Sequence, residues 1–306
     1  MTRIRLALVV VVAFLLASSD LIAQGRFNRN PDRDIAPKGS RVQYKSFYSD
    51  LLNRHLPYAL YLPPSYEHSD REYPVVFFLH GANENERRWS TRGLTDILLD
   101  RMVKEGAIGE FIVAIPFGAN SFYTNSISGD LWEDMITKEF VPMIESTTRS
   151  EGSRGGRAVS GISMGGYGAL KLAFKHPHLF SSVSAHSPML IEDFTAIDIS
   201  KRQASRFYSI FDDIFGLSKD ISYWNKNDPL QIAQHPEDFD GLRIYFDCGT
   251  EDEYGFQNGA IHLSEVLTSK KIDHEFHLYP GSHGWDYAKR HIGASLKFHW
   301  NVLNQQ

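Results

Sequence analysis

The stretch that most constrains the fold runs from Arg157 to Leu170 and reads R-A-V-S-G-I-S-M-G-G-Y-G-A-L. Inside it, Gly161, Ser163 and Gly165 form the pattern G-x-S-x-G. A serine that is pushed out of a sheet at a strand-to-helix turn holds a strained backbone, and residues two positions away on either side must then be small. The pattern therefore predicts a tight turn that presents a serine hydroxyl.

The residues around this pattern fit a strand, a tight turn and a helix. A short strand is expected at 158–159 and a helix at 167–174, and Gly166 and Gly168 would let that helix pack close to the sheet. The pattern also occurs by chance in about one chain in ten of this size, given ordinary Gly and Ser abundance. Its interpretation as a nucleophile therefore depends on partners elsewhere in the chain.

Strands and helices alternate along most of the remaining sequence. Eight strands are expected, at 41–48, 55–62, 74–80, 111–116, 158–159, 181–185, 242–247 and 274–279, and further helices at 91–105, 131–148, 259–269 and 285–302. We expect Asp130 to cap the helix at 131–148 and Pro142 to kink it. An opening hairpin followed by strand-helix alternation predicts an α/β fold with a mostly parallel sheet flanked by helices.

A serine hydroxyl becomes a good nucleophile only when a histidine removes its proton and a carboxylate orients that histidine. In α/β-hydrolases these residues follow in the order Ser, Asp or Glu, His, with the acid after a late strand and the histidine after the last one. His283 lies in the loop after the expected last strand, between Gly281 and Gly284. We therefore expect His283 to be the base.

Four carboxylates, one at the end of the strand at 242–247 and three after it, compete for the role of the acid. Asp252 is preferred because the loop should cross above the sheet five residues after the strand end, whereas Asp247 lies at that end. Glu251 remains an alternative, and a solvated acidic loop would equally explain Glu251 and Glu253. Cys248, which is the one cysteine, is expected to be a small buried residue rather than a nucleophile.

The developing negative charge on a carbonyl oxygen needs two backbone N–H donors, worth roughly 3 kcal/mol each. One is expected from Met164, the residue after the serine. The other is expected from Ala82, in the H-G-x turn that follows the strand at 74–80. We also expect substrate contacts from three aromatic residues, Trp89, Tyr123 and Trp285.

Four segments together resemble the esterase D-like branch of α/β-hydrolases: L-H-G-A-N-E-N-E-R-R-W at 79–89, G-I-S-M-G-G-Y-G-A-L at 161–170, D-C-G-T-E-D at 247–252 and G-S-H-G-W at 281–285. That branch includes S-formylglutathione hydrolases, the feruloyl and acetylxylan esterases of carbohydrate esterase family one, and mycolyltransferases. The resemblance implies Ser163 as nucleophile, Asp252 as acid, His283 as base, and oxyanion donors at Ala82 and Met164. It favours Asp252 over Asp247 and implies an eight-stranded α/β-hydrolase domain.

The first 23 residues are expected to be a signal peptide, because Arg3 and Arg5 precede an apolar run at 6–17 and a small-residue cleavage site. A retained membrane anchor is the alternative, although the run is short for a bilayer. A flexible leader at 24–40 and one hydrolase domain at 41–304 would follow. The chain is thus expected to be exported to the periplasm or beyond, without stable membrane association.

Strand-helix alternation breaks at about 190–240, where we expect a short helical cap over the carboxyl ends of the strands. Its aromatics, Phe194, Phe207, Tyr208, Phe211, Phe215, Tyr223 and Trp224, are expected mostly to form its own core, with one or two contacting substrate. Export and an aromatic cap favour feruloyl or acetyl esters of carbohydrates as substrates.

Other functions stay open at this stage. Acyl transfer of the mycolyltransferase type is weakened because that branch usually carries Asp where this chain has His80. S-formylglutathione hydrolysis is weakened by the expected export. A serine peptidase and a non-catalytic binding module are further alternatives. A net charge of −5 and the lack of a basic tract give no indication of a nucleic-acid partner, and no cofactor or metal is expected.

Overall fold

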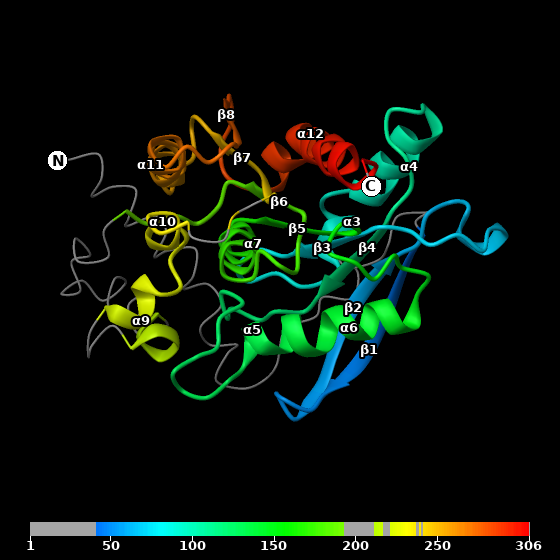
Figure 1. Cartoon of the computed structure of the whole chain (residues 1–306), viewed down its shortest axis with the longest axis horizontal. Coiled ribbons are helices and arrows are strands. Elements are labelled where there is room, and N and C mark those ends of the chain that lie inside the picture. Colours follow the sequence, from blue (N-terminus) through cyan, green and yellow to red (C-terminus); the bar gives the residue numbers. More distant parts are fainter. Residues whose placement is uncertain (1–40, 193–210, 217–220, 237–238, 240, 306) are drawn as a thin grey trace.

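The computed structural model describes residues 41–192, 211–216, 221–236, 239 and 241–305. The expected signal peptide and leader lie outside these residues, as does part of the expected cap. The described part of the chain is organised around one sheet with helices on both faces (Figure 1).

The sheet has eight strands in the order β1-β2-β4-β3-β5-β6-β7-β8. Their bounds are Val42–Ser49 (β1), Arg54–Tyr61 (β2), Val75–Leu79 (β3), Ile112–Pro116 (β4), Arg157–Ile162 (β5), Ser182–His186 (β6), Arg243–Gly249 (β7) and Glu275–Tyr279 (β8). β2 pairs antiparallel with both β1 and β4, and every other neighbouring pair is parallel. The opening hairpin and the mostly parallel eight-stranded sheet are therefore confirmed.

The helices alternate with these strands. They are α3 (Arg88–Thr91), α4 (Thr95–Lys104), α5 (Trp132–Asp134), the π-helix η3 (Met135–Phe140), α6 (Val141–Thr147), α7 (Met164–Lys175), α9 (Ser222–Asn225), α10 (Pro229–Ile232), α11 (Phe256–Ser269) and α12 (Trp285–Leu303), with a 3-10 turn, η2 (Tyr66–His68), after β2. None of the described helices combines the length and the apolar character that crossing a membrane requires.

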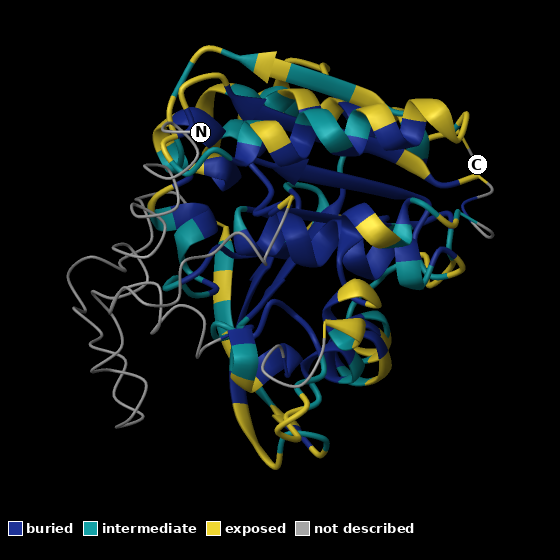
Figure 2. Cartoon of the chain, turned by 90° about the vertical axis from the view of Figure 1, so that its left-hand side faces the viewer, coloured by how far each residue is buried: buried dark blue, intermediate teal, exposed yellow. Residues whose placement is uncertain are grey.

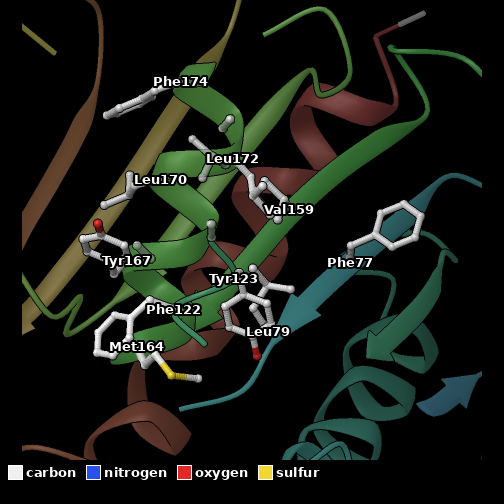
Figure 3. Close-up of a cluster of buried hydrophobic side chains, with 14 of the residues drawn as sticks. Phe77, Leu79, Phe122, Tyr123, Val159, Met164, Tyr167, Leu170, Leu172 and Phe174 are labelled. Atoms are coloured by element: carbon white, nitrogen blue, oxygen red, sulfur yellow. The ribbon is translucent and has the colours of Figure 1, made fainter. Parts of the chain in front are cut away.

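Alternate side chains of the central strand β3 enter two separate apolar cores. Phe77 belongs to a core that includes residues of α6, α7 and α11, whereas Phe78 belongs to a second core that includes residues of α4 and α12. All five residues of β3 are buried, as expected for a parallel strand that is covered on both faces. Figure 2 shows this buried interior enclosed by exposed outer helix faces, and Figure 3 shows α7 packed beside β3 and β5.

Two expected helices differ from the structure. The helix expected at 91–105 is two helices, because Leu94 adopts a left-handed backbone (φ 52°) between α3 and α4. The helix expected at 131–148 contains the π-helix η3 immediately before Pro142, which sits in the first turn of α6. The expected cap by Asp130 is wrong: Leu131 occupies that position, and the Asp130 carboxylate accepts from the Trp132 indole (3.3 Å) instead.

The described part of the cap is anchored by aromatic packing. Phe211, Phe215 and Trp224 pack on one another and on Phe122 and Tyr167 of the main body, and all five are at most 4% exposed. These rings are core residues, but they belong to the core of the main body rather than to a separate core of the cap, which was the expectation. Phe194, Phe207 and Tyr208 lie outside the described residues.

Candidate active site

Ser163 lies between the end of β5 and the start of α7, at the carboxyl edge of the sheet. Its backbone is strained, with φ 57° and ψ −119°. Two hydrogen bonds hold this conformation: the Ser163 N–H donates to the carbonyl of His186 (2.9 Å), and the Ser163 carbonyl accepts from the N–H of Met189 (3.1 Å). The turn is thus clamped by the chain that leaves β6, and the Ser163 side chain is partly exposed.

The glycines of the motif are required by close backbone contacts. A Cβ atom on Gly161 would lie 2.1 Å from the carbonyl oxygen of Gly165. A Cβ atom on Gly165 would lie 2.0 Å from the carbonyl oxygen of Leu79, so Gly165 lets α7 approach β3. Gly168 has a different role from the one expected, because its Cβ would meet the ring of Tyr123 (2.5 Å) rather than the sheet.

A continuous chain of hydrogen bonds joins Ser163 to His283 and Asp252. The Nε2 atom of His283 is 3.0 Å from the Oγ atom of Ser163, and its Nδ1 atom is 2.7 Å from Oδ2 of Asp252. The Asp252 side chain is fully buried, whereas that of His283 is 10% exposed. The structure therefore brings together the three residues that the sequence analysis selected, although they come from three different loops.

The loop that carries His283 is fixed by its neighbours from the β7–α11 loop. The backbone N–H of His283 donates to Oε2 of Glu253 (2.9 Å). Glu253 is therefore a structural contact of the His283 loop and not simply a solvated side chain. Tyr254 and Phe256 pack edge-on against the imidazole, with ring centroids at 4.9 and 5.3 Å. The N–H of Tyr254 also donates to Oδ1 of Asp252 (3.0 Å), which orients the carboxylate.

The competing carboxylates occupy other positions. Asp247 is fully buried and accepts hydrogen bonds from the side chains of His186 (2.9 Å), Tyr245 (3.0 Å) and Tyr287 (2.9 Å), which tie β6, β7 and α12 together. Glu251 is exposed. Cys248 is buried, and burial raises the pKa of its thiol well above the ordinary value, which agrees with the expected packing role.

The turn after β3 lies directly beside Ser163. A Cβ atom on Gly81 would be 3.5 Å from Cβ of Ser163, so the backbone of Gly81 lies beside the Ser163 side chain. Within the described parts of the chain, the N–H groups of Ala82 and Met164 donate to no protein acceptor. Met164 is the first residue of α7, where N–H groups have no partner within the helix.

His80 supports this turn as a neutral side chain. Its Nε2 atom accepts from the N–H of Gly118 (2.9 Å), so the proton is on Nδ1, which donates to the carbonyl of Gly81 (2.8 Å). Complete burial lowers the pKa of His80 to about 4. His80 thus links the turn to the loop that follows β4.

The three aromatics that were expected to contact substrate lie in different environments. Trp89 is 1% exposed and packs in the core against Tyr61 and Phe78. Tyr123 has no exposed surface, and its hydroxyl donates to the carbonyl of His80 (3.1 Å). Packing therefore leaves Trp89 and Tyr123 without surface for a substrate in this structure. Trp285 is partly exposed, and a substrate contact there stays a prediction.

Sequence reasoning did not assign a role to Glu84, Glu253 or Tyr254, although all three lie in or beside the quoted motifs. Their contacts with the His283 loop join segments far apart in sequence, so only the fold identifies them. Among the residues that the structure describes, no group of three or more His, Cys, Asp or Glu side chains could hold a metal ion.

Comparison with known proteins gives a consistent result. Residues 49–298 match the Esterase family model, described as "Putative esterase". Esterase Rv1288 of Mycobacterium tuberculosis is 26% identical over 79% of this chain and 56% of its own length. An endo-1,4-beta-xylanase/feruloyl esterase of Xylanibacter ruminicola is 27% identical over 51% of this chain and 23% of its own length. The chain thus spans about half of the first relative and less of the second.

Among solved structures, a ferulic acid esterase superposes with a TM-score of 0.72 and 25% sequence identity. The match covers 86% of this chain and 98% of that one. The sheet and the helices around it thus have an α/β-hydrolase fold.

Proposed function

The chain belongs to the Esterase family of α/β-hydrolases, and we propose that it is a carboxylic ester hydrolase that works through a serine acyl-enzyme. One observation carries the proposal: the strained Ser163 is hydrogen-bonded to His283, which is hydrogen-bonded to the buried Asp252. The relatives named esterases and the superposition on a ferulic acid esterase support the same reaction class.

In this mechanism, Oγ of Ser163 attacks the ester carbonyl while Nε2 of His283 removes the hydroxyl proton. Asp252 holds the proton on Nδ1 of His283, which keeps Nε2 free to accept, and it stabilises the imidazolium that forms. When the tetrahedral intermediate collapses, the C–O bond to the alcohol breaks and His283 gives the proton to the leaving oxygen. Water then attacks the acyl-enzyme with His283 again acting as the base.

The backbone N–H groups of Ala82 and Met164 are the proposed donors to the oxyanion. Ala82 follows Gly81, where a Cβ atom would lie 3.5 Å from Cβ of Ser163, and Met164 follows Ser163 at the start of α7, which supports this choice. Loss of one such donor typically costs about 3 kcal/mol of transition-state stabilisation.

The proposed substrates are acyl esters of carbohydrates, with feruloyl or acetyl groups. The similarity to feruloyl esterases supports this class, as does the export that Arg3, Arg5 and the apolar run at 6–17 predict. Purified protein should release ferulate or acetate from esterified oligosaccharides. Cleavage of short synthetic esters without release from any such oligosaccharide would refute this substrate class and leave the esterase proposal standing.

Steady-state hydrolysis of p-nitrophenyl acetate tests the reaction itself. Ser163→Ala should lower kcat by several orders of magnitude, and Asp252→Asn by up to about 10⁴-fold because the imidazole loses its orienting carboxylate. Glu251→Gln is the matched control, since this exposed neighbour of Asp252 should leave kcat unchanged. Near-wild-type turnover by folded Ser163→Ala would contradict the proposal.

A further inference from the structure

A second carboxylate, Glu84, joins the two loops that border Ser163. Its Oε2 atom accepts from the backbone N–H of Gly81 (3.3 Å), in the turn that also contains Ala82. Its Oε1 atom accepts from the indole N–H of Trp285 (2.6 Å), two residues after His283. One side chain therefore connects the proposed oxyanion turn with the loop of the proposed base, across 201 positions of sequence.

The partner indole has little freedom to move. The ring of Trp285 packs on Phe78 of β3, with centroids 6.2 Å apart and planes 31° apart. On another side it contacts Gly93, where a Cβ atom would lie 2.6 Å from Cζ3 of Trp285. These contacts hold the Trp285 N–H in place. The Glu84 carboxylate that accepts from it therefore also holds the turn after β3 in place.

The environment of Glu84 ties it electrostatically to the site. Burial raises the pKa of Glu84, while the hydrogen bond from Trp285, the charge of Arg88, the Gly81 N–H and the charge of protonated His283 all act to lower it. The ionised carboxylate therefore interacts favourably with the imidazolium that His283 becomes during the reaction. Asp252 contacts the imidazole directly, whereas Glu84 acts through the neighbouring loop and at longer range.

We propose that Glu84 is a positioning residue for ester hydrolysis. Through its hydrogen bonds with Gly81 and Trp285, it fixes the N–H of Ala82 and the imidazole of His283 relative to each other. This inference rests on the function proposed above. An oxyanion donor is effective only about 2.7–3.1 Å from the oxygen, and a misplacement of about 1 Å can cost about 100-fold in rate. A bridge between two loops is therefore expected to affect the chemical step more than substrate binding.

Kinetics of Glu84→Leu, Trp285→Phe and the double variant, with p-nitrophenyl acetate, test this role. Each single variant should lower kcat about 10- to 100-fold with KM within threefold of wild type. The double variant should be no slower than the slower single variant, because both changes break the same bridge. Trp285→Phe keeps an aromatic ring against Phe78 while removing the indole N–H. It therefore tests the same bridge if Glu84→Leu does not fold.

Two matched controls separate positioning from stability. Glu110→Leu removes another carboxylate that bridges two loops, because Glu110 accepts from the N–H of Ser65 (2.9 Å). Glu110 lies just before β4, at the amino ends of the parallel strands and therefore away from Ser163. Trp300→Phe shortens a second indole of α12, packed near Gly109. Both controls should lower the melting temperature at least as much as the test variants while leaving kcat within threefold of wild type.

The outcomes distinguish this inference from the proposed function. If wild type neither hydrolyses esters nor reacts with a fluorophosphonate, the proposed function fails. If wild type is active and folded Glu84→Leu and Trp285→Phe keep kcat within threefold, the positioning role is refuted. Multiplying losses in the double variant would also refute it, because they would show two independent contributions.

Discussion

Replacing Glu133 with glutamine should leave a buried ammonium group without its full counter-charge. The Lys171 side chain has no exposed surface, and its Nζ atom lies 2.8 Å from Oε2 of Glu133, which is 6% exposed. Nζ also donates to the hydroxyl of Thr124 (2.9 Å) and the carbonyl of Tyr123. These contacts connect α7 to the loop that contains Tyr123, beside the turn after β3.

The expected cost is about 3–5 kcal/mol of unfolding free energy, the usual result of removing one partner of a buried ion pair. Burial already lowers the pKa of Lys171 to about 8 against the attraction of Glu133. Without that carboxylate, loss of the Lys171 proton would remove the cost of keeping a buried, unpaired charge. Glu133 also bonds to Lys175 (2.8 Å) and His176 (2.9 Å), and these interactions are lost together with that of Lys171.

Urea unfolding at pH 7, followed by tryptophan fluorescence, gives this quantity directly. Asp134→Asn is the matched control, because Asp134 pairs with Lys138 (2.7 Å), whose side chain is 65% exposed. Loss of that exposed pair should cost at most about 0.5 kcal/mol. A cost below 1 kcal/mol for Glu133→Gln, equal to that of the control, would refute the reasoning about the buried pair.

Two further changes test the packing and the electrostatics. Gly165→Ala should destabilise the protein by several kcal/mol in thermal unfolding, because the new Cβ would lie 2.0 Å from the carbonyl oxygen of Leu79. Gly293→Ala in α12 is the control: its Cβ would meet no atom from outside α12 nearer than 3.7 Å, so it should stabilise the protein by up to about 1 kcal/mol. Equal effects of the two changes would contradict the steric reasoning. Burial raises the pKa of Asp228 to about 7, so its contribution to stability is present below pH 4 and is lost as the pH rises through 7. Asp228→Asn should therefore gain stability relative to wild type between pH 4.5 and pH 8, by up to about 4 kcal/mol, and a constant difference across this range would count against it.

The features that the sequence predicted well depend on local pattern. Apolar runs such as 74–80 and 111–116 predicted buried parallel strands to within about two residues. The three residues of the hydrogen-bonded chain were found because chain order and loop position narrow the search. The strand signals lie within short stretches, whereas the choice of Asp252 and His283 also used the chain order that is typical of α/β-hydrolases.

The features that were missed depend on tertiary contacts. The left-handed Leu94 that separates α3 from α4 has no local signal, since leucine rarely adopts this conformation. The burial of Trp89 depends on Tyr61 and Phe78 from other strands, and the pairing of Glu84 with Trp285 spans most of the domain. In these cases the environment of a residue is determined by partners that lie far away in the sequence.

Intact-mass spectrometry after reaction with a fluorophosphonate tests the central proposal most directly, because such probes phosphonylate an activated serine far faster than an ordinary hydroxyl. Wild-type protein should gain the mass of one adduct, which maps to Ser163, and Ser163→Ala should gain none. Glu251→Gln, beside the proposed acid, should be labelled as wild type is. A folded wild-type protein that takes up no probe, or an adduct that persists in Ser163→Ala, would contradict the proposal that Ser163, His283 and Asp252 form a catalytic triad.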